Sequence, residues 1–328
     1  MKIGLESHPV AVSGSYAESL YELLSRHAPE HEYLLDCNNR DDLDVYHDSG
    51  TAPWHGRRGR VPHVVTVRNL GCLRHPELFS RRERRAVLDP YRAAVRGAAR
   101  LIVPHGGAGR ELARLLGIGP ERIEVFLPLT VCPPAAEPDA PALDAVRRKY
   151  ALPDEFLLTV GPPEPRRHLP ELLAAMADAG CSRACVVCGR RTPYAERLLA
   201  RLRTLRAVSR VEFLYEPEPA DLPALFRLAH GFVYLPDASA EAPAAPIVEA
   251  LRAGLPSLLS DLPLHREAAD DAAAYVRPET HDELVEALRR LDGDAGFRRA
   301  LHGRGLRRAE AFSEEAVVRR LLAIYSAL

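Results

Sequence analysis

Short apolar runs alternate with amphipathic segments along the whole 328-residue chain. Apolar runs bounded by turn residues predict buried strands, and segments with apolar residues three or four positions apart predict helices that cover a sheet. This alternation is typical of βα units around parallel sheets, so we expect an α/β fold with Rossmann-like domains. Because the chain exceeds the size at which one hydrophobic core usually stops growing, we expect two such domains.

The first half contains predicted strands at 2–5, 32–35, 64–67, 101–103 and 123–126. Its predicted helices cover 15–27, 80–99 and 108–116. Asp89-Pro90 should divide the second of these helices, since proline lacks an N–H donor and is best placed at a helix start. The second half repeats the rhythm, with strands at 156–160, 185–187, 211–214, 232–235 and 257–259 and helices at 169–179, 194–206, 246–253 and 282–291.

A proline-dense, apolar-poor stretch at 131–141 separates the halves and reads as an extended linker. We therefore predict an N-terminal Rossmann-like domain over 1–132, a linker over 133–142 and a C-terminal Rossmann-like domain over 143–312. The last helix, 313–328, is expected to pack back on the first domain. Two facing parallel sheets would present the carboxyl ends of their strands to one cleft, which is the usual ligand position in such folds.

The most informative segment is SAEAPAAPIVEAL, residues 239–251. Pro246 suits the first turn of a helix, so the amides of 245–248 are predicted to be unpaired and to form an anion site. Glu249, one turn further on, is placed to accept hydrogen bonds from ribose hydroxyls, as acidic residues do in other nucleotide folds. Glu241, in the preceding loop, is placed to reach sugar hydroxyls.

This segment resembles the signature of the retaining GT-B glycosyltransferases of family 4, in which two glutamates are separated by seven residues. The strand and turn at 156–161 and the following EPRRHL at 164–169 are similar to the strand, glycine turn and basic pair of that family. In the first half, Ser13-Gly14-Ser15-Tyr16 resembles the family's glycine loop, and 64–122 resembles its mannosyltransferase-like group 1 members. The resemblance covers nearly the whole chain.

The resemblance implies a GT-B fold, with two Rossmann-like domains whose parallel sheets face an interdomain cleft. The second domain would hold a UDP- or GDP-sugar, the first would hold most of the acceptor, and the sugar would be transferred with retention of configuration. The implied donor-binding residues are Gly14, Gly161, Arg166, Arg167, Ala245, Pro246, Ile247 and Glu249. The implied catalytic residues are Arg167, Glu241 and Arg68, the last standing where the family usually has His.

The chemistry is coherent with these residue types. Negative charge builds on the departing diphosphate as the glycosidic bond breaks, and Arg offers a fork of donors to phosphate oxygens. Fixed cations and a helix N-terminus stabilise such charge without a metal ion, so no metal site and no cofactor beyond the donor are expected. The resemblance to the family also implies front-face transfer, in which the leaving phosphate helps to deprotonate the acceptor, so no carboxylate pair would be required.

Two other functions fit the same architecture. Arg68 and Ala242-Pro243-Ala244 differ from the family's usual His and Gly-Phe-Gly, which fits a catalytically degenerate protein that acts as a binding or scaffold partner of another transferase. A nucleotide-sugar epimerase is a third interpretation. Donor turnover, complex formation with another transferase, and isomerisation of the donor sugar would separate the three.

The charge distribution bears on partners and location. A formal net charge of −1 argues against a dedicated nucleic-acid binder. Between Arg57 and Arg110, however, thirteen arginines stand against three acidic residues. This stretch is either a solvated helix face or a surface that attracts an anionic or lipid-linked acceptor, or a membrane. The first residues lack a signal-peptide pattern and no apolar stretch is long enough to span a bilayer, so we expect a cytoplasmic protein, with peripheral contact to the inner membrane face if that stretch binds lipid.

Three weaker motifs have simpler explanations. His105 to Arg110 (HGGAGR) looks like a phosphate cradle but lacks the P-loop Lys-Ser/Thr, so we interpret it as the start of a helix. Asp42-Leu43-Asp44 has the DxD pattern of metal-dependent transferases but lies in an acidic loop and is interpreted as incidental. Cys185 and Cys188 have CxxC spacing within a predicted strand, where residues three apart point to opposite faces, so neither zinc nor redox use is expected.

Overall fold

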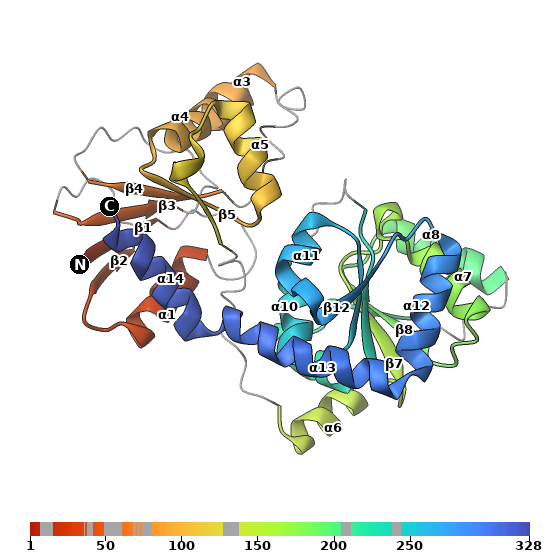
Figure 1. Cartoon of the computed structure of the whole chain (residues 1–328). Helices are drawn as coiled ribbons and strands as arrows, with labels where there is room; N and C mark the ends of the chain where they lie inside the picture. Colours follow the sequence, from red (N-terminus) through yellow and green to blue (C-terminus); the bar gives the residue numbers. More distant parts are fainter. Residues whose placement is uncertain are drawn as a thin grey trace. The chain divides into compact units, whose positions relative to one another are not determined.

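The computed structural model describes residues 1–6, 16–35, 37, 42–48, 61–67, 70, 73, 80–126, 138–204, 211–237 and 244–328. The chain divides into two compact units, one made of Met1–Pro133 with Ala311–Leu328 and the other of Pro134–Glu310. In the described part of the chain, each unit contains one sheet of six parallel strands, with helices on both faces (Figure 1). The predicted α/β class with two Rossmann-like domains is therefore confirmed.

The sheet of the first unit has the strand order β2-β1-β3-β4-β5-β6. Its strands are β1 (Lys2–Glu6), β2 (Glu32–Leu35), β3 (Val45–Asp48), β4 (His63–Thr66), β5 (Arg100–Val103) and β6 (Ile123–Val125). The main helices are α1 (Tyr16–His27), α3 (Arg81–Glu83), α4 (Asp89–Gly97), α5 (Gly106–Leu116) and α14 (Glu314–Ser326).

Two hydrophobic clusters hold this first unit together, one on each face of its sheet. On one face, α1 and α14 pack against strand residues such as Ile3 and Leu5. On the other face, α4 and α5 pack against Val65 and Leu101. Figure 1 shows α1 beside α14 on one side of the sheet and α4 beside α5 on the other. The last helix of the chain therefore belongs to the core of the first unit.

The arginine-rich helical segment of the first unit is interrupted as its proline predicts. A π-helical stretch, η2 (Arg84–Leu88), ends where α4 begins at Asp89, with Pro90 in its first turn. A proline there has no partner to lose, because the first N–H groups of a helix have no acceptor within it. The predicted boundary at Asp89-Pro90 is therefore found as a change from π- to α-helical turns, while the run from Arg81 to Gly97 stays helical throughout.

The sheet of the second unit has the order β12-β11-β10-β7-β8-β9. Its strands are β7 (Phe156–Val160), β8 (Ala184–Gly189), β9 (Val211–Tyr215), β10 (Gly231–Tyr234), β11 (Ser257–Ser260) and β12 (Ala273–Val276). Its helices are α6 (Ala140–Lys149), α7 (Leu169–Asp178), α8 (Pro193–Thr204), α9 (Leu222–Leu228), α10 (Ala245–Arg252), α11 (Pro263–Ala269), α12 (His281–Gly293) and α13 (Ala295–Ala309). Figure 1 shows α10 and α11 on one side of this sheet and α7, α8 and α12 on the other.

Two strands of the structure, β3 and β12, were not predicted from the hydrophobic pattern. Strand β3 (VYHD) carries His47 and Asp48, both buried, and a polar pair at the end of a run predicts a loop. Strand β12 (AAYV) follows directly on a short 3-10 turn and pairs with β11 at the edge of its sheet. The remaining predicted strands are present, each within two residues of its expected bounds.

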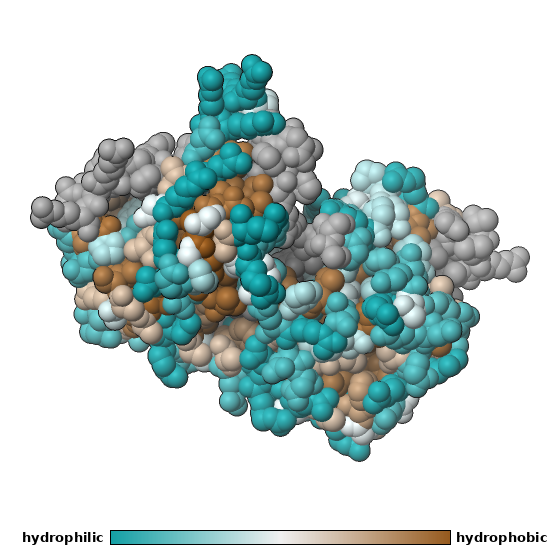
Figure 2. Space-filling view, turned by 45° about the horizontal axis from the view of Figure 1, so that its top comes forward, coloured by the Kyte–Doolittle hydropathy of each residue, from teal (hydrophilic) through white to brown (hydrophobic). Residues whose placement is uncertain are grey.

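No helix in the described ranges is long and apolar enough to cross a membrane. On the face that Figure 2 shows, hydrophilic residues cover most of the surface and hydrophobic residues lie between them.

Candidate functional site

The strand order of the second unit places a topological switch point between β7 and β10. The chain builds β7, β8 and β9 towards one edge of the sheet, then returns to the other side of β7 to build β10, β11 and β12. The loops that follow β7 and β10 therefore leave the sheet in opposite directions. In open α/β sheets, ligands bind in the crevice outside the carboxyl ends of the strands at this point.

The turn after β7 runs close to β8 because a glycine stands on each side of the contact, Gly161 in the turn and Gly189 at the end of β8. Gly161 has φ of 124°, a conformation that L side chains rarely adopt, and its N–H donates to the carbonyl oxygen of Cys188 over 2.8 Å. A Cβ atom on Gly189, at the end of β8, would lie 2.4 Å from the carbonyl oxygen of Gly161. Any side chain at Gly189 would therefore push the turn away from the sheet.

The basic pair follows on a short 3-10 turn, η5 (Pro165–Arg167), and its two members have different surroundings. The carbonyl oxygen of Arg166 accepts from the N–H of Asp237 over 2.9 Å, which ties η5 to the loop after β10. The Arg166 side chain is half exposed, and its Nη2 donates to Oε2 of Glu164 over 3.3 Å. Arg166 is thus a surface cation that already has an acidic partner.

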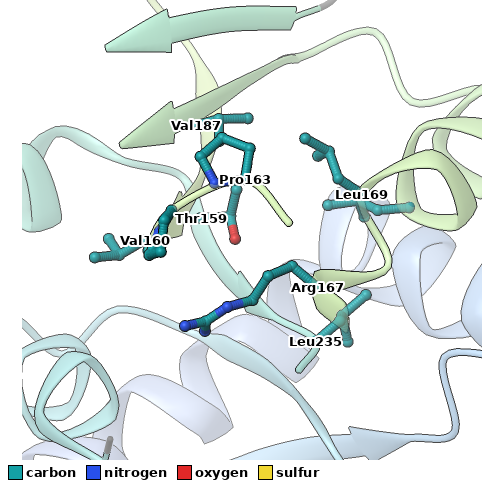
Figure 3. Close-up of a pocket in the computed structure, with 10 residues that line it drawn as sticks. Thr159, Val160, Pro163, Arg167, Leu169, Val187 and Leu235 are labelled. Atoms are coloured by element: carbon teal, nitrogen blue, oxygen red, sulfur yellow. The ribbon is translucent and has the colours of Figure 1, made fainter. Parts of the chain in front are cut away.

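Arg167 lies in the switch-point crevice itself. Its side chain runs from η5 towards the end of β7 and lines a pocket together with Thr159, Val160, Pro163 and Leu235 (Figure 3). The guanidinium atoms Nε and Nη1 are buried, and neither has a hydrogen-bond partner among the described residues. A buried donor without an acceptor costs about 1–3 kcal/mol, and more when it is charged, so these two N–H groups are suited to an anionic ligand.

Tyr234, the last residue of β10, provides the surface on which Arg167 rests. The Arg167 Cζ atom lies 5.3 Å from the centre of the Tyr234 ring, within the range of a cation–π interaction. Such contacts contribute about 0.5–2 kcal/mol, depending on how far water is excluded. Tyr234 is 1% exposed, which favours the upper part of that range.

Helix α10 begins on the other side of the switch point, and here one prediction is wrong. The helix starts at Ala245 with Pro246 in its first turn, as expected. However, the amides of Ile247 and Val248 both donate to the carbonyl oxygen of Ala244, over 3.0 and 3.1 Å. Ala244, which precedes the helix, is itself in helical conformation, so its carbonyl takes up the amides of Ile247 and Val248, two of those that were expected to be unpaired.

Glu249 lies one turn into α10 and is partly buried. Its Oε1 accepts from Nη1 of Arg252 over 2.8 Å, a contact between residues three apart on one helix face. Burial raises the pKa of the Glu249 carboxyl, and the charge of Arg252 opposes this to a smaller extent. The carboxylate is thus held by Arg252 and is not an isolated helix-start acid.

Sequence reasoning missed a second set of buried polar atoms near this crevice. His265, on α11, is fully buried, and its Nδ1 bonds to the carbonyl oxygen of Ser260 over 2.9 Å. Burial lowers the pKa of His265 to about 4, so the ring is neutral at neutral pH. Neither Nε2 of His265 nor Oγ of Ser260 has a hydrogen-bond partner within the described segments. A His beside Arg266 and Glu267 in a short helix gives no sequence signal of this environment.

Three predicted site residues, Gly14, Arg68 and Glu241, lie outside the described residues, as do Ala242 and Pro243. The structure describes the other predicted site residues. They lie on the segments that follow β7 and β10, namely Gly161, Arg166, Arg167 and the start of α10.

The weaker motifs have structural partners. Lys2 contacts both aspartates of the DxD pattern: its N–H donates to Asp44 Oδ2 and its Nζ to Asp42 Oδ2, each over 2.7 Å. His105 caps α5, since its Nδ1 accepts from the N–H of Ala108 over 3.1 Å. No group of His, Cys, Asp or Glu side chains within the described ranges could hold a metal ion.

Two family models match the chain. Residues 144–306 match the model described as glycosyl transferases group 1, and residues 40–128 match a glycosyl transferase 4-like domain.

Two curated relatives and a solved structure resemble the chain. The O-antigen chain mannosyltransferase RfbU of Salmonella typhimurium is 30% identical over 107 residues, which cover 33% of this chain and 30% of that protein. The D-inositol 3-phosphate glycosyltransferase of Salinispora tropica is 30% identical over 303 residues, which cover 84% of this chain and 61% of that protein. In both cases the chain covers less than two thirds of the relative's own length. The structure of Anabaena HepE in complex with UDP and glucose superposes with a TM-score of 0.73 at 14% identity over 100% of both chains, which shows the shared GT-B fold.

Proposed function

We propose that this protein transfers a sugar from a UDP- or GDP-sugar to an acceptor. The family models support this proposal, since residues 144–306 match the group 1 glycosyltransferases and residues 40–128 match a glycosyl transferase 4-like domain. The observation that carries the proposal is the guanidinium of Arg167, which has two buried donors without an acceptor among the described residues, at the switch point of the second unit. A diphosphate is the ligand chemistry that such a fork of donors fits. The bound UDP and glucose of HepE support a nucleotide-sugar donor.

In this proposal the donor binds along the carboxyl edge of the second sheet. The diphosphate contacts Arg167, whose guanidinium packs against the backbone at Gly161 because glycine has no side chain there. The carboxylate of Glu249 accepts from ribose hydroxyls, and the start of α10 at Ala245 and Pro246 adds the positive end of its dipole. Arg166, Ile247, Gly14, Glu241 and Arg68 remain predicted members of the site.

The reaction follows from this placement of charge. The bond between the anomeric carbon and the diphosphate oxygen breaks, and both bonding electrons stay on the diphosphate. Arg167 stabilises that charge without reorganisation, so the cation is supplied by the protein and the reaction is metal-independent. The acceptor oxygen bonds to the same face of the anomeric carbon, its proton passes to the leaving phosphate, and configuration is retained.

The acceptor is proposed to be anionic or lipid-linked. Arg81, Arg82, Arg84 and Arg85 are exposed on α3 and η2 in the first unit, within the arginine-rich stretch. Such a group of cations attracts phosphate groups of an acceptor or a membrane surface, and the attraction weakens with salt. Flotation with anionic vesicles at low and high salt tests this part of the proposal.

Calorimetric binding of UDP, GDP and their sugars tests the donor site. Arg167→Ala should weaken binding of the preferred nucleoside diphosphate by roughly 10- to 150-fold, since hydrogen bonds to charged groups contribute about 1.5–3 kcal/mol. Arg190→Ala is the matched control, because Arg190 is an exposed cation of the same unit, 68% exposed. The proposal fails if neither nucleotide binds or if the two variants behave alike. Turnover of the donor, with the anomeric configuration of the product read by NMR, separates a retaining transferase from an epimerase and from an inactive binding partner.

A further inference from the structure

The guanidinium of Arg167 contacts the last residue of one strand and the turn that follows another. It lies over the ring of Tyr234 at the end of β10, 5.3 Å from the ring centre. A Cβ atom built on Gly161, after β7, would lie 3.1 Å from its Cζ, so the guanidinium packs directly against the backbone there. These two strands flank the switch point, and Arg167 bridges their carboxyl ends.

The phenol group of Tyr234 also interacts with Arg167. Burial raises the pKa of Tyr234, while the charge of Arg167 and a hydrogen bond between the two side chains oppose that rise. An aliphatic residue at the end of β10 would fill the same space but would offer the guanidinium no aromatic face. An aromatic ring at this position therefore matters to the cation and not only to the core.

The ring of Tyr234 cannot move freely, because it belongs to a row of packed aromatic rings. It stacks on Phe232, with ring centres 5.6 Å apart and an interplanar angle of 17°. It also packs against His265, with ring centres 5.4 Å apart. His265 is fixed in turn by its bond to Ser260. The surface under Arg167 is thus rigid and fully buried.

We propose that Tyr234 is a positioning residue of the donor site: its ring holds the Arg167 guanidinium in one orientation, with Nε and Nη1 presented to the diphosphate. This inference rests on the proposed function, because it assigns Tyr234 to the site in which Arg167 binds the donor. An arginine side chain ordered in advance loses little freedom when the ligand binds, so affinity and discrimination between phosphate positions both benefit.

Three variants test the proposal through binding of UDP and GDP, with uridine and guanosine as probes that lack the diphosphate. Tyr234→Leu removes the ring face and should weaken nucleoside diphosphate binding by roughly 2- to 30-fold, the range expected for a cation–π contact. Nucleoside binding should stay unchanged. Tyr234→Phe keeps the ring and should recover most of the lost affinity. Phe226→Leu is the matched control, because Phe226 is buried in the same aromatic row but packs on Phe232.

A double-mutant cycle separates positioning from general packing. In an Arg167→Ala background, Tyr234→Leu should have no further effect on diphosphate binding, because there is no guanidinium left to orient. A full effect in that background, or an equal loss with Phe226→Leu, would overturn the proposal.

A readout without nucleotide keeps this inference distinct from the proposed function. The Nε–H resonance of Arg167 should be dispersed and slow to exchange in the wild-type protein, and should become averaged in Tyr234→Leu but not in Tyr234→Phe. If that pattern is found and no nucleotide binds, the proposed function falls while the positioning contact stands. If nucleotides bind and Tyr234→Leu leaves both affinity and resonance unchanged, the positioning role falls while the transferase proposal stands.

Discussion

Replacing Gly161 by alanine is expected to damage both the fold of the β7 turn and the placement of Arg167. The φ of 124° at Gly161 lies where only glycine is comfortable. An added Cβ would also lie 3.1 Å from Cζ of Arg167 and 3.2 Å from each of its Nη atoms. Because the guanidinium is the far end of a long side chain, it should move away and leave its position over Tyr234.

The two effects have separate magnitudes. Holding alanine in a sparsely populated backbone region costs about 1–3 kcal/mol of unfolding free energy. Loss of a charge-assisted hydrogen bond to the diphosphate costs about 1.5–3 kcal/mol of binding, which is roughly 10- to 150-fold in the dissociation constant. The first effect appears in urea unfolding of the ligand-free protein, and the second in calorimetric titration with UDP or GDP.

Gly293→Ala is the matched control for this substitution. Gly293 ends α12 in the same unit, and a Cβ there would meet nothing within 4 Å. Alanine should leave binding unchanged and stability equal or up to about 1 kcal/mol higher, since it has the better helix propensity. If Gly161→Ala unfolded more easily but bound nucleotide as tightly as the wild type, the backbone at Gly161 would not place Arg167 for the ligand.

Three further predictions concern stability and pH. Burial lowers the pKa of His47 to about 4, so between about pH 6.5 and 4 the unfolded chain binds a proton at this histidine and the folded protein does not. The unfolding free energy should therefore fall by roughly 1.4 kcal/mol for each pH unit of acidification in that window. Urea unfolding at pH 7 and at pH 4.5 should show a smaller fall for His47→Gln than for the wild type. Arg252→Ala removes the cation that opposes the raised pKa of Glu249, so nucleotide affinity, measured from pH 8 to 6, should drop more steeply than in the wild type. Arg167→Met should stabilise the ligand-free protein to urea while weakening diphosphate binding as Arg167→Ala does, because it removes buried donors that have no acceptor in the described structure; a loss of stability would contradict this.

The hydrophobic pattern predicted most strands because the side chains that they bury are apolar. It failed where a strand buries polar side chains. In β3, His47 is 2% exposed, yet both ring nitrogens have partners. Nδ1 bonds to the hydroxyl of Tyr325 and Nε2 to that of Thr66, each over 2.7 Å. These partners lie 278 and 19 residues away along the chain, so no local rule shows that this histidine can be buried.

The sequence predicts which loops form the candidate site, but it does not predict how the side chains of those loops are arranged. The sequence indicates the loops after 156–160 and 232–235, and it pairs Arg166 with Arg167 as equals. Only the structure separates them, because Glu164 takes up one cation and the crevice holds the other. Likewise, Pro246 correctly marks the start of a helix, but the conformation of Ala244 decides where the first amides point.

The turn that carries Arg167 breaks several local rules at once, and its tertiary contacts explain how it does so. His168, just after Arg167, has a φ of 49°, which is unfavourable for a residue with a side chain, and Gly161, at the other end of the turn, has a φ of 124°, which in practice only glycine adopts. Hydrogen bonds join this turn to three other elements. The N–H of Gly161 donates to β8, and the hydroxyl of Thr192, at the start of α8, donates to the carbonyl oxygen of Pro163 over 2.6 Å. The N–H of Asp237, in the loop after β10, donates to the carbonyl oxygen of Arg166. Strained residues persist only where the surroundings over-determine them, and such residues gather at binding sites. All of these contacts are made by the protein's own residues, so the fold itself holds the turn that carries Arg167 in place, which is a condition for electrostatic stabilisation of a leaving diphosphate.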